Sequence, residues 1–158
     1  MSVFIPTIDF QGYDEQDDAA LEDLANQVSR ALTRSGFMRI MNLGIASAQV
    51  DHVFALSKWF FSLSEEQKLT SAYTSAVENF GYQSLGVEHL NPSKPADLKQ
   101  TFTLRNLLRH DKDDPRWPKP EFRDQSTDFY KACLEGAHRI QRVLSKALGV
   151  EQDFFVQY

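Results

Sequence analysis

Three long stretches of the sequence repeat apolar residues at three- and four-residue steps, the pattern of an amphipathic helix. In the first stretch the repeating positions are Leu21, Leu24, Ala25, Val28, Ala31 and Leu32. Asp17 and Asp18 suit the N-terminal end, because acidic side chains cap a helix and complement its dipole. Gly36 is a natural stop. The pattern therefore predicts a helix between these two acids and Gly36.

The second stretch begins at Ser47, which suits an N-cap. Its apolar positions are Val50, Val53, Phe54, Phe60 and Phe61, with Trp59 beside them. We expect Phe54, Phe60 and Phe61 to anchor this helix to the core. Residues 64–67 (SEEQ) have the form of a capping box, so a new short helix is predicted to begin there after a kink.

The third stretch runs from about residue 122 to residue 148 and is followed by a glycine that makes a natural helix end. Its apolar positions keep near-helical spacing at Phe129, Cys133, Ala137, Ile140, Leu144 and Leu148. This pattern predicts one long helix close to the C-terminal end of the sequence.

Four shorter stretches have strand character: residues 5–10, 37–42, 82–85 and 98–104. The order is strand, helix, strand, helix, short helix, two strands and long helix. That is an α+β pattern, and it lacks the regular alternation of a doubly wound sheet. The strands near Tyr82 and Thr101 have no evident sheet partners, so we expect a larger sheet to continue beyond Tyr158.

Composition narrows the class of protein. The 158 residues fit one domain, and the formal charge of −5 comes with no basic stripe, so nucleic acid is not an expected partner. No apolar run approaches the roughly 18 residues of a membrane span. The first residues lack the pattern of a signal peptide. The single Cys133 cannot form an internal disulfide. These features predict a soluble, cytoplasmic protein without a membrane partner.

The residues offer no recognisable catalytic or metal centre. The four histidines are His52, His89, His110 and His138, and none has an acid two residues later, the spacing of a 2-His-1-carboxylate iron site. Cys133 lies on the apolar side of a predicted helix, which favours an inert, buried thiol. The nucleophile elbow, the phosphate-binding loop and the dinucleotide fingerprint are all missing. We therefore assign no catalytic residue and no metal ligand.

One region combines polar and aromatic residues on predicted strands. On a strand, Thr101, Thr103 and Arg105 share one face, while Phe102 and Leu104 share the other. A polar face that ends in an arginine suits a pocket for an anionic or hydroxylated small molecule. An ordinary solvent-facing edge has the same pattern, so periodicity alone leaves both interpretations open.

Five short motifs, in order along almost the whole chain, resemble the N-terminal region of the isopenicillin N synthase-like oxygenases. They are residues 5–10 (IPTIDF), residues 35–45 (SGFMRIMNLGI), residues 60–68 (FFSLSEEQK), Gly81-Tyr82 followed by residues 97–102 (DLKQTF), and residues 147–150 (ALGV) with Phe154-Phe155. The second motif has Asn42-Leu43-Gly44 where the family usually has Asn-His-Gly. Each motif is weak alone, and the shared order carries the resemblance.

The resemblance implies that residues 1–158 are a non-haem dioxygenase N-terminal domain whose helices pack beside the first strands of a double-stranded β-helix, or jelly-roll, core. In the family this core carries His-x-Asp and a distal His for Fe(II), and Arg-x-Ser for 2-oxoglutarate. None of these motifs is present, so the catalytic core is expected to be a missing C-terminal partner, and neither cofactor is expected to be held by this chain. The activity implied for the full-length protein is oxidation of a small organic molecule.

The resemblance also places the segment after Gly81 and the strand around residues 101–103 beside the substrate. It therefore gives Tyr82, Ser84, Thr101 and Thr103 as substrate-binding candidates, and strand alternation adds Arg105. The alternative is a standalone, non-catalytic α+β module that binds a partner or a small molecule. The coding sequence after Tyr158 separates the two hypotheses.

Overall fold

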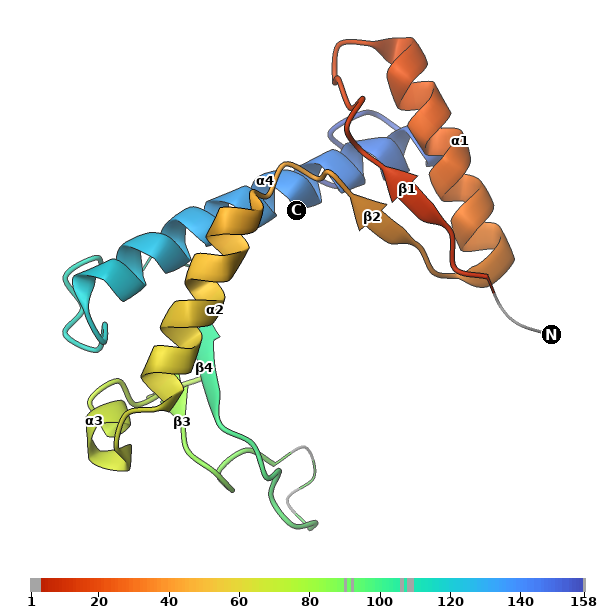
Figure 1. The fold of residues 1–158 in the computed structure, drawn as a ribbon. Helices are drawn as coiled ribbons and strands as arrows, with labels where there is room; N and C mark the ends of the chain where they lie inside the picture. The colour runs from red at the N-terminus through yellow and green to blue at the C-terminus, as the bar shows by residue number, and fades with distance from the viewer. Residues whose placement is uncertain (1–3, 90, 92, 106, 108–109, 158) are drawn as a thin grey trace. The chain divides into compact units, whose positions relative to one another are not determined.

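A computed structural model describes residues 4–89, 91, 93–105, 107 and 110–157. The chain divides into two compact units. The first unit comprises Met1–Ala46 and Lys131–Tyr158, and the second comprises Ser47–Tyr130. Within the described residues the elements follow the order β1, α1, β2, α2, α3, β3, β4, α4 (Figure 1). This α+β content agrees with the predicted order of elements.

In the first unit, helix α1 (Asp18–Ser35) begins and ends where the sequence predicts. The Asp17 carboxylate accepts hydrogen bonds from the backbone N–H groups of Ala19 and Ala20, and so satisfies two free donors of the first turn. Gly36 closes the helix at φ 71°, a left-handed conformation that suits glycine.

Strands β1 (Thr7–Asp9) and β2 (Arg39–Met41) pair in parallel beside α1 (Figure 1). Ile8 lies opposite Ile40, and both pack in the core of this unit, whereas Thr7 and Arg39 are exposed. The buried core residues are Ile8, Phe10, Leu21, Leu24, Ala25, Val28, Ala31 and Val143. The predicted amphipathic face of α1 is therefore its buried face, except that Leu32 at its C-terminal end is 38% exposed.

The last helix, α4 (Pro120–Leu148), begins in the second unit and continues into the first. In the first unit Val143 is fully buried, and Gly136 passes so close to Leu43 that an added Cβ would lie 2.9 Å from its Cδ2. Lys146 Nζ contacts Asp18 Oδ1 at 2.6 Å, which joins α4 to the start of α1. No helix in the described ranges is long and apolar enough to span a membrane.

The second unit begins with α2 (Ser47–Phe61) and the short α3 (Glu65–Leu69), which are separate helices as predicted. The capping box at Ser64 is complete. The Ser64 hydroxyl accepts from the Gln67 backbone, and the Gln67 side chain accepts from the Ser64 backbone. This reciprocal pair fixes the point at which α3 starts.

The buried face of α2 differs from the predicted one. Phe60 is fully buried, but Phe54 is 72% exposed and Phe61 is 37% exposed, and Leu56 takes the second buried position. Leu56 and Phe60 are four residues apart and so share a helix face, whereas Phe54 lies about 200° around the helix from Leu56. The prediction that Phe54 anchors the helix is therefore wrong in this chain.

The two strands expected to lack partners pair with each other. Strands β3 (Phe80–Gln83) and β4 (Thr101–Leu104) form an antiparallel two-stranded sheet, and Ala72 adds an isolated parallel bridge to Tyr82. The prediction of unpartnered strands is wrong, because the pairing joins two segments about twenty residues apart in the sequence, which local patterns do not reveal. β3 also begins two residues earlier than predicted, and it includes Gly81 at φ 116°.

Candidate functional site

The register of β3 and β4 decides which predicted site residues share a face. Tyr82 is opposite Phe102, Gln83 is opposite Thr101, and Gly81 is opposite Thr103. Directly opposed residues of an antiparallel pair point to the same side of the sheet, and successive residues alternate. Tyr82 and Phe102 therefore lie on one face, and Thr101 and Thr103 lie on the other. We call the first the aromatic face and the second the polar face.

The aromatic face forms the core of the second unit. Phe60 from α2 is the central ring, with its centroid 4.9 Å from that of Phe102, 5.6 Å from Tyr82 and 5.7 Å from Phe122. The contacts with Tyr82 and Phe102 are edge-to-face, an arrangement that aromatic quadrupoles favour. This packing holds the two strands on α2 and leaves the polar face free of the core.

The polar face carries two of the predicted site residues, Thr101 and Thr103. The Thr101 hydroxyl donates to Gln83 Oε1 at 3.4 Å, and Thr103 lies half-buried opposite a glycine that has no side chain. Arg105 follows the end of β4 and is exposed, and Ser84 follows the end of β3 and is half-buried. The structure thus groups Thr101 and Thr103, with Arg105 and Ser84 just beyond the strand ends.

Tyr82 lies apart from the other candidates, with its side chain on the aromatic face and only 2% of its surface exposed. Its hydroxyl donates to both carboxylate oxygens of Glu65, at 3.2 and 3.0 Å. Lys68 Nζ contacts Glu65 at 2.9 Å and donates to Gln100 Oε1 at 2.9 Å. Burial raises the pKa of Tyr82, and the Lys68 ammonium lowers the pKa of Glu65.

This Tyr82–Glu65–Lys68–Gln100 network ties α3 to β3 and to the residue that precedes β4, and sequence analysis identifies only Tyr82 of its four members as a candidate. The capping box at Ser64 marked the first turn of α3, and Glu65 and Lys68 are spaced i, i+3 on that helix, which is contact spacing for an ion pair. That signal could have found the pair. The hydrogen bond from Lys68 to Gln100 could not be found from local spacing, because the two residues are 32 positions apart.

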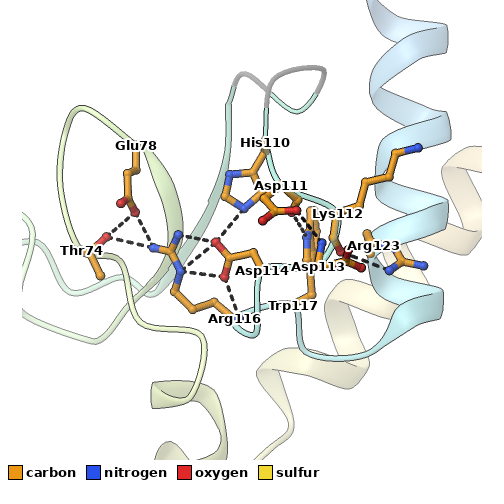
Figure 2. Close-up of polar contacts among 10 residues, drawn as sticks. All are labelled: Thr74, Glu78, His110, Asp111, Lys112, Asp113, Asp114, Arg116, Trp117 and Arg123. Atoms are coloured by element: carbon orange, nitrogen blue, oxygen red, sulfur yellow. Dashed lines mark hydrogen bonds and ion pairs between the residues drawn. The ribbon is translucent and has the colours of Figure 1, made fainter.

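A second polar cluster centres on Arg116 (Figure 2). Its Nη1 donates to Glu78 Oε2 at 2.7 Å and to Thr74 Oγ1 at 2.9 Å. Its Nε donates to Asp114 Oδ1 at 3.0 Å, and its guanidinium lies 5.2 Å from the centre of the Phe80 ring. One arginine therefore fastens residues 110–119 to the turn that precedes β3.

His110 packs beside this cluster. Its ring stacks on Phe80 at 3.9 Å between centroids, and Trp117 meets it edge-on at 5.7 Å. His110 Nε2 lies 3.1 Å from Asp114 Oδ2, an ion-pair distance without hydrogen-bond geometry. Sequence analysis assigns His110 no functional role, and in the structure its ring packs against Phe80 of β3.

We expect the Arg116 cluster to make the stability of the second unit depend on acid pH. Hydrogen bonds from Arg116 lower the pKa of Asp114. A carboxyl whose folded pKa is depressed contributes stability above its unfolded pKa, and that contribution is lost as the pH falls through the folded value. Asp114→Asn should therefore cost about 1–2 kcal/mol at pH 7, and less as the pH falls below about 4.

Urea unfolding of both proteins between pH 7 and pH 3, followed by tryptophan fluorescence, measures this difference. Asp113→Asn is the matched control, because Asp113 is adjacent and exposed, and its carboxylate forms no ion pair within the described part of the chain. A constant difference between wild type and Asp114→Asn at all pH values would contradict the expectation.

The described residues do not fit an iron centre. They contain no group of three or more His, Cys, Asp or Glu side chains placed to hold a metal ion. Cys133 is half-buried, and burial raises the pKa of its thiol, which disfavours the thiolate that binds metals. No chemical step through iron is therefore assigned to these residues.

Comparison with known proteins gives the family. The sequence model described as non-haem dioxygenase in morphine synthesis N-terminal matches residues 5–125. The 2-oxoglutarate-dependent dioxygenase caaD of Aspergillus niger is 28% identical, over 92% of this chain and 48% of its own length. Leucoanthocyanidin dioxygenase of Perilla frutescens is 30% identical, over 94% of this chain and 41% of its own length. The chain thus spans less than half of either relative.

Solved structures share the fold. JOX2, solved in complex with 2OG, Fe and JA, is 28% identical with a TM-score of 0.71, over 97% of this chain and 43% of its own. The full-length T7H of Neurospora crassa, solved with alpha-KG and thymine, is 24% identical with a TM-score of 0.77, over 98% of this chain and 51% of its own. Because the family model matches residues 5–125, most of the sequence, this chain belongs to the non-haem dioxygenase N-terminal family.

Proposed function

We propose that this chain is the N-terminal part of an Fe(II)/2-oxoglutarate-dependent oxygenase that oxidises a small organic molecule in the cytoplasm. The observation that carries the proposal is the family match over residues 5–125, together with relatives that are about twice as long and are named as 2-oxoglutarate-dependent enzymes. Oxygenase activity would then also require the second half of the enzyme.

In this proposal residues 1–158 form one N-terminal domain beside the first strands of a jelly-roll core that the chain does not contain. That core would hold Fe(II) and 2-oxoglutarate. Two hydrophobic cores, one in each unit, support the structural role, because they keep the strands and helices of this part in place.

We also propose that the polar face of β3 and β4 forms part of the substrate wall. Thr101 and Thr103 carry this proposal, because their side chains lie on the face that the aromatic core leaves free. Arg105 and Ser84 extend this surface from the strand ends. Tyr82 would act differently, since its hydroxyl is held by Glu65 and would reach a substrate only through that network.

Succinate release tests the function. The 158-residue chain alone should neither bind Fe(II) stoichiometrically nor release succinate from 2-oxoglutarate. A longer protein that includes the sequence encoded after Tyr158 should do both. The measurements are metal content after purification and succinate formed under oxygen with added Fe(II) and 2-oxoglutarate.

The control is the longer protein with the first histidine of its expected His-x-Asp motif changed to alanine, which should lose iron and succinate release together. Turnover by the 158-residue chain alone would contradict the proposal. So would a stop codon directly after Tyr158, which would favour a standalone binding module.

A further inference from the structure

The first unit contains a groove of about 490 Å³ between α1 and the segment that leads into β1. Its volume lies in the range of small-molecule sites. The apolar lining comes from Phe4, Pro6, Ile8 and Ala31, and the charged lining comes from Arg30 and Arg34. None of the residues proposed for the substrate wall lines it, and all groove residues belong to the first unit.

Two cationic side chains, those of Arg30 and Arg34, line this groove. Arg30 and Arg34 are spaced i, i+4 on α1, where like charges repel each other. No carboxylate of the described residues forms an ion pair with either side chain, whereas Arg139 and Arg142 in the same unit pair with Glu135 and Asp153. The helix dipole favours Arg34 in the last turn of α1, but its effect does not reach Arg30 one turn earlier.

Two of the three uncharged polar side chains that line the groove, those of Gln27 and Ser35, already donate to other groups, and Thr7 is the third. Gln27 Nε2 donates to Asp23 Oδ2 at 2.8 Å, and the Ser35 hydroxyl donates to the Ala31 carbonyl at 3.0 Å. The charged donors that a ligand meets are therefore the two guanidinium groups, and the Thr7 hydroxyl adds a neutral polar group. Ile8 and Ala31 supply part of the apolar lining and also belong to the core of this unit.

We propose that this groove binds a small amphipathic anion, with a carboxylate on Arg30 and Arg34 and an apolar body along Ile8, Pro6 and the exposed ring of Phe4. Guanidinium groups recognise carboxylates through paired, charge-assisted hydrogen bonds. The apolar lining favours a ligand whose remaining surface is hydrocarbon or aromatic. The site is independent of the proposed oxygenase function.

The probe is 4-phenylbutyrate, which carries one carboxylate on an aromatic hydrocarbon chain, titrated into the 158-residue chain and followed by amide NMR shifts. We expect saturable shifts at Ile8, Ala31 and Ser35. The neutral analogue 4-phenylbutanol should bind about tenfold more weakly, because it lacks the charge-assisted contacts. Raising the salt concentration should weaken the binding of 4-phenylbutyrate and leave the binding of the alcohol unchanged.

Arg30→Gln and Arg34→Gln should each weaken 4-phenylbutyrate binding about tenfold, with unchanged binding of the alcohol. Arg39→Gln is the matched control, since it removes the same charge from an exposed residue of β2 that does not line the groove. All three positions are on the surface, and equal denaturant midpoints check that the variants are folded. Equal affinity for the acid and the alcohol, no saturable shift at the groove, or equal loss in Arg39→Gln would overturn the proposal.

Discussion

Phe60→Ala is expected to lower the free energy of unfolding of the second unit by about 3–5 kcal/mol. Phe60 is fully buried, and its ring contacts the rings of Tyr82, Phe102 and Phe122 from three other elements. The truncation removes buried apolar surface and also leaves a cavity between α2 and the β3–β4 pair. A loss of this size is a large share of the stability of a small protein.

Phe54→Ala is the matched control, because it deletes the same side chain from the same helix at a position that is 72% exposed. It should change the free energy of unfolding by less than about 0.5 kcal/mol. The chain has only two tryptophans, Trp59 and Trp117, and both lie in the second unit, so their fluorescence in urea reports on that unit. Equal midpoints for the two variants would show that α2 buries a different face.

Gly81→Ala is expected to be comparably severe. Gly81 adopts φ 116°, and a Cβ there would lie 2.7 Å from the Ser71 carbonyl oxygen and 2.9 Å from backbone atoms of Ala72 and Tyr73. Backbone strain and forced overpacking each cost about 1–3 kcal/mol. Because the obstructing atoms are backbone, no side-chain rotation relieves the clash, and the bridge between Ala72 and Tyr82 should open.

Gly86→Ala separates the two causes. Gly86 also has a positive φ, of 76°, but nothing lies within 4 Å of the Cβ that the substitution adds. It should therefore show only the conformational cost, about 1–2 kcal/mol. Urea midpoints followed by tryptophan fluorescence, with amide exchange of Tyr73 and Tyr82 as a local probe, compare the variants. If Gly81→Ala were no worse than Gly86→Ala, close packing at β3 would not be the reason for this glycine.

Local signals in the sequence predicted the helices well. The Asp17 cap, the Gly36 stop and the capping box at Ser64 each involve residues within a few positions of one another, so their hydrogen bonds follow from local order. The face of α2 was less predictable, because apolar residues surround that helix. Which of them is buried depends on where β3 and β4 pack.

The sequence predicts which side chains of one strand share a face, but it does not predict how the two strands are placed against each other. Strand alternation correctly separated Thr101 and Thr103 from Phe102. It could not place Tyr82 on the opposite face, because that depends on the register between two strands about twenty residues apart. The Arg116 cluster was missed for a similar reason, since its partner Glu78 is 38 positions away and lies in an ordinary polar turn.

The division into units has a consequence for the order of folding during synthesis. The second unit is one continuous segment, Ser47–Tyr130, whereas the first needs Lys131–Tyr158 as well as the N-terminal residues. Val143 belongs to the same core as Ile8, so the N-terminal segment must wait for more than a hundred further residues before that core closes. During translation β1, α1 and β2 therefore leave the ribosome first, but the core that they belong to closes last. The second unit can fold earlier, as soon as its own continuous segment has been synthesised.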